Sequence, residues 1–258
     1  MKIKEVIEAL ERFAPLPLQE SYDNAGLQVG LTEVEVSGAL LCLDVTEAVL
    51  DEAIERGCNL VLSHHPLLFR SLKSVTDRTL VERCLRKAIM GGLAIYSAHT
   101  NLDNARGGVN FKIAEKLKLH SVEFLQKQTE ESGSGVIGCL EKAVSSAFFL
   151  ENVKSLFGVE CLMHNERLRR EVKKVAICGG AGDFLLDDAI EQGADAFITG
   201  EMHYHLYFGQ EQRIQIAVLG HYQSEQYTKE LICSIIQEAC PSLQVVETRQ
   251  NTNPINYL

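Results

Sequence analysis

The sequence predicts an α/β protein made of two intertwined, pseudo-symmetric α/β repeats with mixed sheets. Two observations predict this fold class. Short apolar runs that end in polar residues alternate along the chain with stretches whose apolar residues recur at helical spacing. A segment in the second half also matches one in the first half without a gap. The alternation is typical of βαβ units, in which a right-handed crossover joins two parallel strands.

Length and composition limit the class of protein further. The chain has 258 residues, which suits one large domain or two intertwined ones, and 46% of them are apolar. No stretch approaches the roughly 20 apolar residues of a membrane helix, and the amino terminus alternates charged with apolar residues, unlike a signal peptide. A net charge of −10 without a basic block disfavours nucleic acid as a partner. Eight cysteines without a Cys-x-x-Cys pair indicate free thiols in a reducing cytoplasm.

The first half of the chain contains an amphipathic helix followed by a βαβ unit. Thr46 and Gly57 are suited to begin and end the helix of that unit. The predicted elements, in order, are a helix over 2–13, a strand over 38–43, a helix over 46–56, a strand over 60–62, a helix over 77–90, a strand over 93–97 and a helix over 109–118.

Two adjacent histidines, His64 and His65, follow the strand over 60–62. Open α/β sheets bind ligands at the carboxyl ends of their strands, which makes this pair a candidate site. Adjacent residues of a straight strand point to opposite faces, so the chain must bend between Ser63 and Pro66 if both imidazoles serve one site. The alternative is one structural histidine and one surface histidine.

The second half begins with a less regular region. Residues 128–135 are rich in serine and glycine and resemble a linker, and residues 167–174 are charged and are expected to form a solvated hairpin or loop. Between them we expect a strand over 136–139 and a helix over 145–157. We assign residues 1–125 to the first repeat and 126–258 to the second, the two being intertwined in one compact unit.

The internal repeat aligns residues 39–65 with residues 175–201, a constant separation of 136 positions. His65 then falls on Glu201. A second correspondence, with a separation of 122, places His99 on His221 and Asp103 on Glu225. Each half therefore ends one strand in a ligand-type residue and another in a His-x-x-x-carboxylate sequence.

Duplication brings equivalent strand ends together between the repeats. Five ligand-type side chains would converge there: His64, His65, Asp103, His221 and Glu225. Three imidazoles and two carboxylates exceed what one metal with an open position needs, whereas two metals that share a bridging carboxylate account for all five. Such a pair would activate water and stabilise developing charge in hydrolysis. Nitrogen and oxygen ligands without thiolate favour zinc, iron(II) or manganese over copper(I).

The strand-end motifs resemble those of the Nif-three-like family, whose members are also called homologues of type 2 GTP cyclohydrolase I. The matching segments are Ser63-His64-His65-Pro66, Ala98-His99-Thr100-Asn101-Leu102-Asp103, Thr199-Gly200-Glu201-Met202, the run from Gly220-His221 to Ser224-Glu225, and an amino-terminal segment that begins Asp23-Asn24. The resemblance implies two intertwined α/β repeats, a ring-shaped homohexamer and a dinuclear site. On the matching positions its ligands would be His64, His65, Asp103, His221 and Glu225, with Glu225 bridging.

Several residues near these motifs have more than one interpretation. His99 is either a second-shell or substrate-binding residue or a core histidine, and Glu201 is either a general base or a conformational cap. The glycine-rich run 179–182 could bind an anion at a helix amino terminus, or could form a tight turn. The segment 203–205 departs from the adjacent histidines of many relatives, so no role is assigned to His203 or His205.

Two functions are compatible with these residues. The first is a metal-dependent hydrolase that acts on a nucleotide or another small heterocycle, with Glu201 and His99 as candidate catalytic residues. The second is a non-enzymatic metal-binding or adaptor protein that acts through protein partners. The open coordination positions favour the enzyme. The lack of a basic cluster beyond Arg106 and Lys112 near the Asp103 loop counts against GTP specifically.

Overall fold

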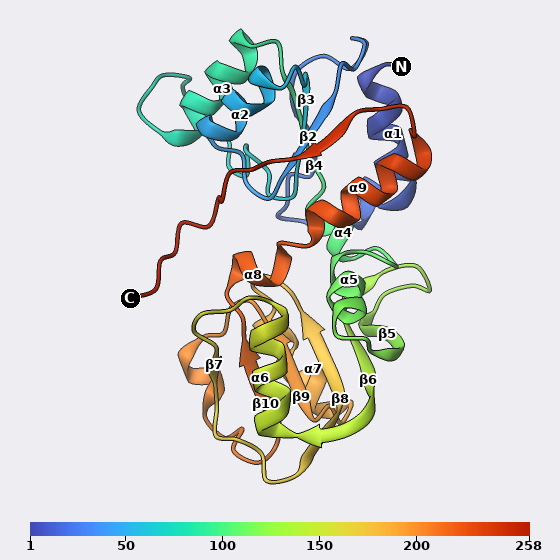
Figure 1. Cartoon of the computed structure of the whole chain (residues 1–258), viewed down its shortest axis with the longest axis vertical. Coiled ribbons are helices and arrows are strands. Elements are labelled where there is room, and N and C mark those ends of the chain that lie inside the picture. Colours follow the sequence, from blue (N-terminus) through green and yellow to red (C-terminus); the bar gives the residue numbers. More distant parts are fainter. The chain divides into compact units, whose positions relative to one another are not determined.

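The computed structural model describes all 258 residues and contains two sheets, each in its own compact unit (Figure 1). The first unit comprises Met1–Ala105 and Thr228–Pro254, and the second comprises Arg106–Tyr227 and Ile255–Leu258. This division differs from the single boundary expected after residue 125, because the last helix and strand of the chain return to the first sheet. Mixed α/β architecture with two mixed sheets, as the sequence predicts, is therefore observed.

The first unit is built on a five-stranded sheet in the order β1-β4-β3-β2-β11. All neighbouring strands are parallel except β1, which is antiparallel to β4. Its elements are α1 (Ile3–Phe13), η1 (Leu16–Leu18), β1 (Gly26–Val29), β2 (Ala39–Cys42), α2 (Glu47–Glu55), β3 (Leu60–Ser63), α3 (Leu80–Met90), β4 (Ala94–Ser97), α4 (Thr100–Asp103), α9 (Thr228–Ala239) and β11 (Val245–Glu247).

Helices cover both faces of this first sheet, with α2 and α3 on one side and α1 and α9 on the other (Figure 1). Every residue of β2, β3 and β4 is buried, as expected for parallel strands covered on both faces. The hydroxyl of Thr46 accepts a hydrogen bond from the Val49 N–H at 3.3 Å and so begins α2, as the sequence predicts. Gly57 follows this helix with a φ of 71°, a conformation that favours glycine.

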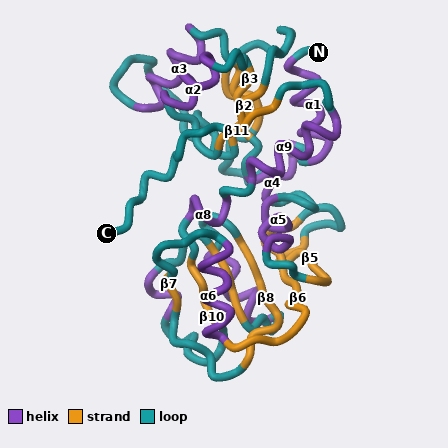
Figure 2. Tube along the Cα trace, in the orientation of Figure 1, coloured by secondary structure: helices purple, strands orange, loops and turns teal.

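The second unit is built on a six-stranded sheet in the order β5-β6-β8-β9-β10-β7 (Figure 2). Strands β8, β9 and β10 are parallel, whereas the β5–β6, β6–β8 and β10–β7 pairs are antiparallel. Its elements are α5 (Val109–Lys116), β5 (His120–Lys127), β6 (Gly133–Ser145), α6 (Ser146–Leu156), β7 (Met163–His164), β8 (Glu171–Cys178), η2 (Asp183–Leu185), α7 (Leu186–Glu191), β9 (Ala196–Thr199), η3 (Tyr204–Tyr207), β10 (Gln215–Val218) and α8 (His221–Glu225).

Two expectations for the second unit are wrong. Residues 128–135 are not a linker but the turn of the β5–β6 hairpin and the first residues of β6, and Gln128 N–H donates to Ser132 O across the turn at 3.0 Å. The charged stretch 167–174 is only partly a loop, because β8 begins at Glu171. In both places the strand begins with serine, glycine or charged residues, which are typical of loops rather than strands.

The internal repeat is confirmed in the register of the strands. The β2–β3 ladder pairs Ala39 with Leu60, and the β8–β9 ladder pairs Val175 with Ala196, 136 positions later in both strands. The second correspondence, with its separation of 122 positions, is wrong by one residue within the strands. Ala94 pairs with Leu60 and Gln215 pairs with Ala196, and these equivalent residues are 121 positions apart. Four-residue apolar strands carry no side-chain pattern that fixes the register to one position.

No helix in the structure combines the length and the apolar character that crossing a membrane requires. All eight cysteines are free thiols. Burial raises the pKa of the Cys84 thiol to about 11, so this group is protonated at neutral pH and offers no thiolate to a metal.

Candidate metal centre

The rings of the adjacent histidines His64 and His65 lie close together where β3 ends. The ring centroids are 5.0 Å apart, and the chain bends at both residues, which is the bend that a shared site requires. His64 is completely buried, and its Nδ1 lies 2.8 Å from the carbonyl oxygen of Ala98. The Nδ1 of His65 lies 2.7 Å from Oδ1 of Asp44. Hydrogen bonds thus hold both rings, the one in the core and the other partly exposed.

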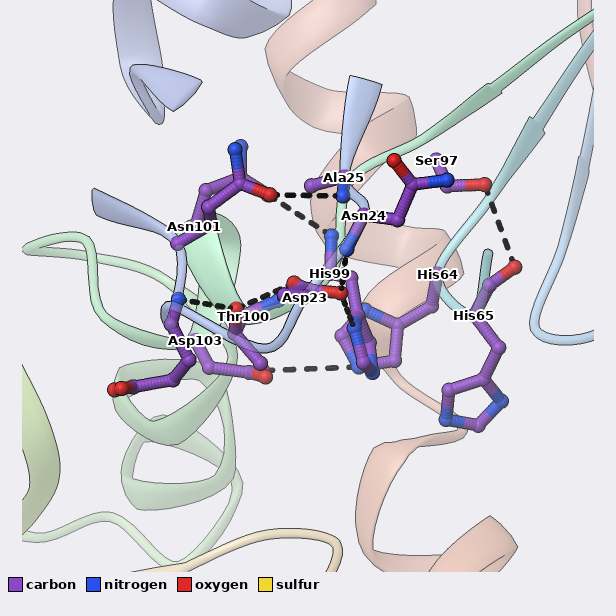
Figure 3. Close-up of polar contacts among 12 residues, drawn as sticks. Asp23, Asn24, Ala25, His64, His65, Ser97, His99, Thr100, Asn101 and Asp103 are labelled. Carbon is purple, nitrogen blue, oxygen red and sulfur yellow. Dashed lines mark hydrogen bonds and ion pairs between the residues drawn. The ribbon is translucent and has the colours of Figure 1, made fainter. Parts of the chain in front are cut away.

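A third imidazole, His99, completes this cluster (Figure 3). One ligand atom from each of His64, His65 and His99 lies within 4.8 Å of the others, so the three rings could hold a metal ion. Oδ1 of Asp103 lies 3.7 Å from Nε2 of His64. The first unit thus gathers the three candidate ligands that the sequence assigns to it and adds His99, which the sequence left as a residue that supports a ligand, contacts substrate or lies in the core.

The hydrogen bonds of the three rings determine which nitrogen of each is available to a metal. The Ala98 carbonyl can only accept, so the Nδ1 of His64 carries the proton. The carboxylates of Asp44 and Asp23 accept in the same way from the Nδ1 of His65 and His99, both at 2.7 Å. A neutral imidazole protonated on Nδ1 presents its lone pair on Nε2, which is the arrangement of metal-ligating histidines. The donor set therefore fits a metal.

Sequence reasoning missed the roles of the two carboxylates that hold these rings. Asp44 directly follows Leu43 beyond the end of β2, and its other oxygen accepts from the Thr252 hydroxyl at 2.7 Å. Its position beyond a strand end was the available signal. Asp23 accepts from the Asn24 N–H at 2.7 Å, and it also accepts from His99 and Thr100.

The electrostatics of Asp23 follow from these bonds. Burial alone would raise the pKa of its carboxyl, but the hydrogen bonds from His99 and Thr100 outweigh burial and hold the pKa at about 2. Its side chain is fully shielded from solvent. Asp23 is therefore charged at neutral pH and fixes the orientation of the His99 ring.

The second unit holds its candidate ligands on one short helix. His221 and Glu225 are four residues apart in α8, and Nε2 of His221 lies 3.2 Å from Oε2 of Glu225. Glu225 is 5% exposed. Glu201, which follows β9, places Oε1 2.7 Å from Nδ1 of His221. Glu201 thus orients His221 as Asp44 orients His65, an arrangement that its assignment as a general base did not include.

The glycine-rich turn after β8 packs against Glu225. Gly180 has a φ of 60°, which favours glycine, and a Cβ at this position would lie 2.3 Å from Oε1 of Glu225, so a larger residue would displace this carboxylate. The N–H groups of Gly179, Gly180 and Gly182 donate to side-chain oxygens of Asn110, Ser224 and Thr199, respectively. Because these donors are engaged, the run acts as a tight turn that makes room for a carboxylate.

The histidines after Glu201 point to other partners. Nδ1 of His203 is hydrogen-bonded to Asp183, which raises the pKa of this imidazole, and the side chain is 87% exposed. The His205 ring lies 5.3 Å from the Tyr204 ring, centroid to centroid. Neither residue hydrogen-bonds to Glu201 or His221.

Comparisons with known proteins agree with this geometry. The family model Duf34/NIF3 (NGG1p interacting factor 3) matches residues 1–254. A protein of Clostridium perfringens named GTP cyclohydrolase 1 type 2 homolog is 34% identical over 262 residues, covering 100% of both chains. A protein of the same name from Lactococcus lactis is 32% identical over 261 residues and 98% of both.

Solved structures show the same fold. The crystal structure of a Bacillus cereus protein related to NIF3 superposes with a TM-score of 0.93 at 24% identity and covers 100% of this chain and 99% of that one. At this identity the likeness concerns the fold alone. Taken with the full-length match of the family model and of the relatives from Clostridium and Lactococcus, it shows that this chain belongs to the Duf34/NIF3 family.

Proposed function

We propose that the chain binds two divalent metal ions, zinc, iron(II) or manganese, and uses them as a hydrolase acting on a nucleotide or a related heterocycle. The proposed ligands are His64, His65 and Asp103 from the first unit and His221 and Glu225 from the second, with Glu225 shared by both ions. The observation that carries the proposal is the hydrogen bonding of the imidazoles, since each Nδ1 faces an oxygen acceptor.

The number of candidate ligands supports the proposal that those of the first unit and those of the second unit serve one metal centre. Divalent metals in catalytic sites usually have three or more protein ligands. The α8 pair, His221 and Glu225, supplies only two. A centre that also takes His64, His65 and Asp103 reaches the number that two ions need, with positions left for substrate. When bound, a pair of divalent ions supplies Lewis-acid chemistry suited to hydrolysis.

The side chains around the ligands have separate roles in this proposal. Asp44 and Glu201 accept hydrogen bonds from Nδ1 of His65 and His221, so Nε2 is the nitrogen of each ring that would bind a metal. Asp23 likewise accepts from Nδ1 of His99. In this proposal Nε2 of His99 either binds a metal ion as a further ligand or contacts the substrate. Glu201 is 57% exposed, so its carboxylate is also accessible to exchange a proton with a bound substrate.

The substrate is proposed only as a class. The two cations near the Asp103 loop in the sequence form ion pairs: Arg106 with Glu123 at 3.2 Å and Lys112 with Glu115 at 3.2 Å. The name GTP cyclohydrolase 1 type 2 homolog belongs to the relatives, and GTP itself is therefore one member of the class to be tested.

The family description, NGG1p interacting factor 3, favours a second candidate, a non-enzymatic metal-binding adaptor. A screen separates the two. Metal-replete protein is incubated with nucleosides, nucleotides and related heterocycles, and mass spectrometry detects products that carry one added water. A turned-over compound whose turnover is lost in His65→Ala supports the enzyme. Two bound ions without turnover of any compound support the adaptor.

The assembly implied by the family resemblance, a ring-shaped homohexamer, remains part of the proposal. Sedimentation equilibrium would then give six times the chain mass of 28.7 kDa. A monomer or dimer at micromolar concentration would contradict it.

A further inference from the structure

A cavity in the second unit lies apart from the candidate metal ligands. It has a volume of about 410 Å³ and is bounded by the end of α5, the start of β5, the middle of β6 and the first turns of α6. Sites for small molecules occupy roughly 300–1,000 Å³, so the size suits a small ligand. No candidate metal ligand and no residue that orients one lines this cavity.

The cavity exists because β6 leaves both of its neighbours at this point. The β5–β6 ladder is irregular between His120 and Glu123, and the β6–β8 ladder is interrupted between Cys139 and Val144. Irregularities of this kind are common beside functional sites, where they redirect side chains. Here they open the sheet where α5 ends and α6 begins.

The lining combines an apolar floor with a cationic rim. The apolar residues are Leu117, Leu140, Val144, Phe148 and Phe149. Phe148 is 61% exposed, a large apolar surface beside the opening. Lys118, Lys142 and His120 stand on the rim against a single carboxylate, Glu141. The two lysines take part in no ion pair, although the chain as a whole carries a net charge of −10.

Backbone conformation on the rim points to a constraint besides folding. Three non-glycine residues of the chain have a positive φ: Lys118 on the rim has a φ of 55°, and Ser121, which follows the rim residue His120, has a φ of 52°. Lys118 follows the last residues of α5, at the position that helices usually fill with glycine. The chain therefore has a lysine at a backbone conformation that favours glycine. Backbone strain of this kind concentrates at functional sites.

We propose that this cavity binds a small amphipathic anion, a molecule with an aromatic or acyl body and one carboxylate, phosphate or sulfonate group. The body packs on Phe148, Leu140 and Val144, and the anionic group lies between the ammonium groups of Lys118 and Lys142. The rim carries two lysines and one carboxylate, so its net positive charge is complementary to an anionic group.

The test uses a fluorescent aromatic sulfonate, 8-anilinonaphthalene-1-sulfonate, titrated into the full-length protein. We expect saturable one-to-one binding that weakens about tenfold in Lys118→Gly and in Lys142→Gln, because each removes one charge-assisted contact. Glycine suits the positive φ at residue 118, so Lys118→Gly should melt at the same temperature or higher. This thermal readout separates lost binding from lost folding.

Two controls make the result specific. Lys173→Gln removes an exposed lysine from β8 of the same sheet, outside the cavity, and should bind the sulfonate as wild type does. The uncharged analogue N-phenyl-1-naphthylamine should be insensitive to both rim lysines, whereas Phe148→Ala should weaken both dyes. Absence of saturable binding in wild type, or equal loss in Lys173→Gln and the rim variants, would overturn the proposal.

Discussion

Asp44 gives the sharpest test of the metal centre, because it is not itself a candidate ligand and orients His65 through Oδ1, while its Oδ2 accepts from the Thr252 hydroxyl. Its Oδ1 lies 2.7 Å from Nδ1 of His65, a charge-assisted contact that orients the ring and raises the basicity of Nε2. Removing such a partner typically costs 10–100-fold in metal affinity. The Asp44 side chain is 36% exposed, so solvent screening places the expected loss for Asp44→Ala near tenfold, or about 1.4 kcal/mol.

The assay is isothermal titration of Zn²⁺ or Mn²⁺ into metal-free protein. Asp44→Asn keeps an oxygen that accepts from Nδ1 but loses the charge, so its affinity should fall between those of wild type and Asp44→Ala. The matched control is Asp51→Ala, which removes an exposed aspartate of the same unit that pairs with Lys87 at 2.6 Å and touches no histidine. Unchanged affinity in Asp44→Ala, or an equal loss in Asp51→Ala, would refute the reasoning from the Nδ1 acceptors.

Three further predictions concern the other carboxylates of the centre. Because Glu225 is the proposed shared ligand, Glu225→Ala should lose both ions, and elemental analysis that still finds two ions per chain would contradict this. Glu201→Gln should retain both ions, since a glutamine oxygen can still accept from His221, while any hydrolytic rate falls by roughly 10²–10⁴ as for a general base; an unchanged rate would remove that role. Because the pKa of Asp23 is depressed to about 2 from 3.8, its contribution to stability is present above pH 4 and is lost on acidification, by about 1 kcal/mol between pH 5 and pH 3. Urea unfolding of metal-free protein at the two pH values should show this loss in wild type and less of it in Asp23→Asn.

The local elements could be predicted from the sequence because their signals lie within a few residues. The βαβ unit over residues 39–63 shows an apolar strand, a threonine cap, a glycine end and a second strand in direct succession. Its repeat at residues 175–199 reproduces the same spacing, and the ladders confirm the register. Strand β5 and the first residues of β6 and β8 were not predicted, since strands tolerate the polar residues that otherwise indicate loops.

Candidate ligands were equally visible, because histidines and carboxylates at strand ends are a local pattern. What the sequence could not determine is which groups hold them. Asp44, Asp23 and the Ala98 carbonyl reach His65, His99 and His64 from strands and turns 21–76 positions away. Hydrogen bonds of this kind depend on where the chain folds back on itself, and no spacing rule encodes them.

The sequence by itself thus determined the fold class, the duplicated βαβ unit and the residue types available to a metal, because periodicity and caps act over short distances. Only the tertiary structure decided that His99 joins His64 and His65, and that each ring bonds through Nδ1 and so presents Nε2. It also decided that Gly180 makes room for Glu225 and that β6 opens a cavity beside Lys118. These features depend on packing between segments distant in the chain, which local patterns do not specify.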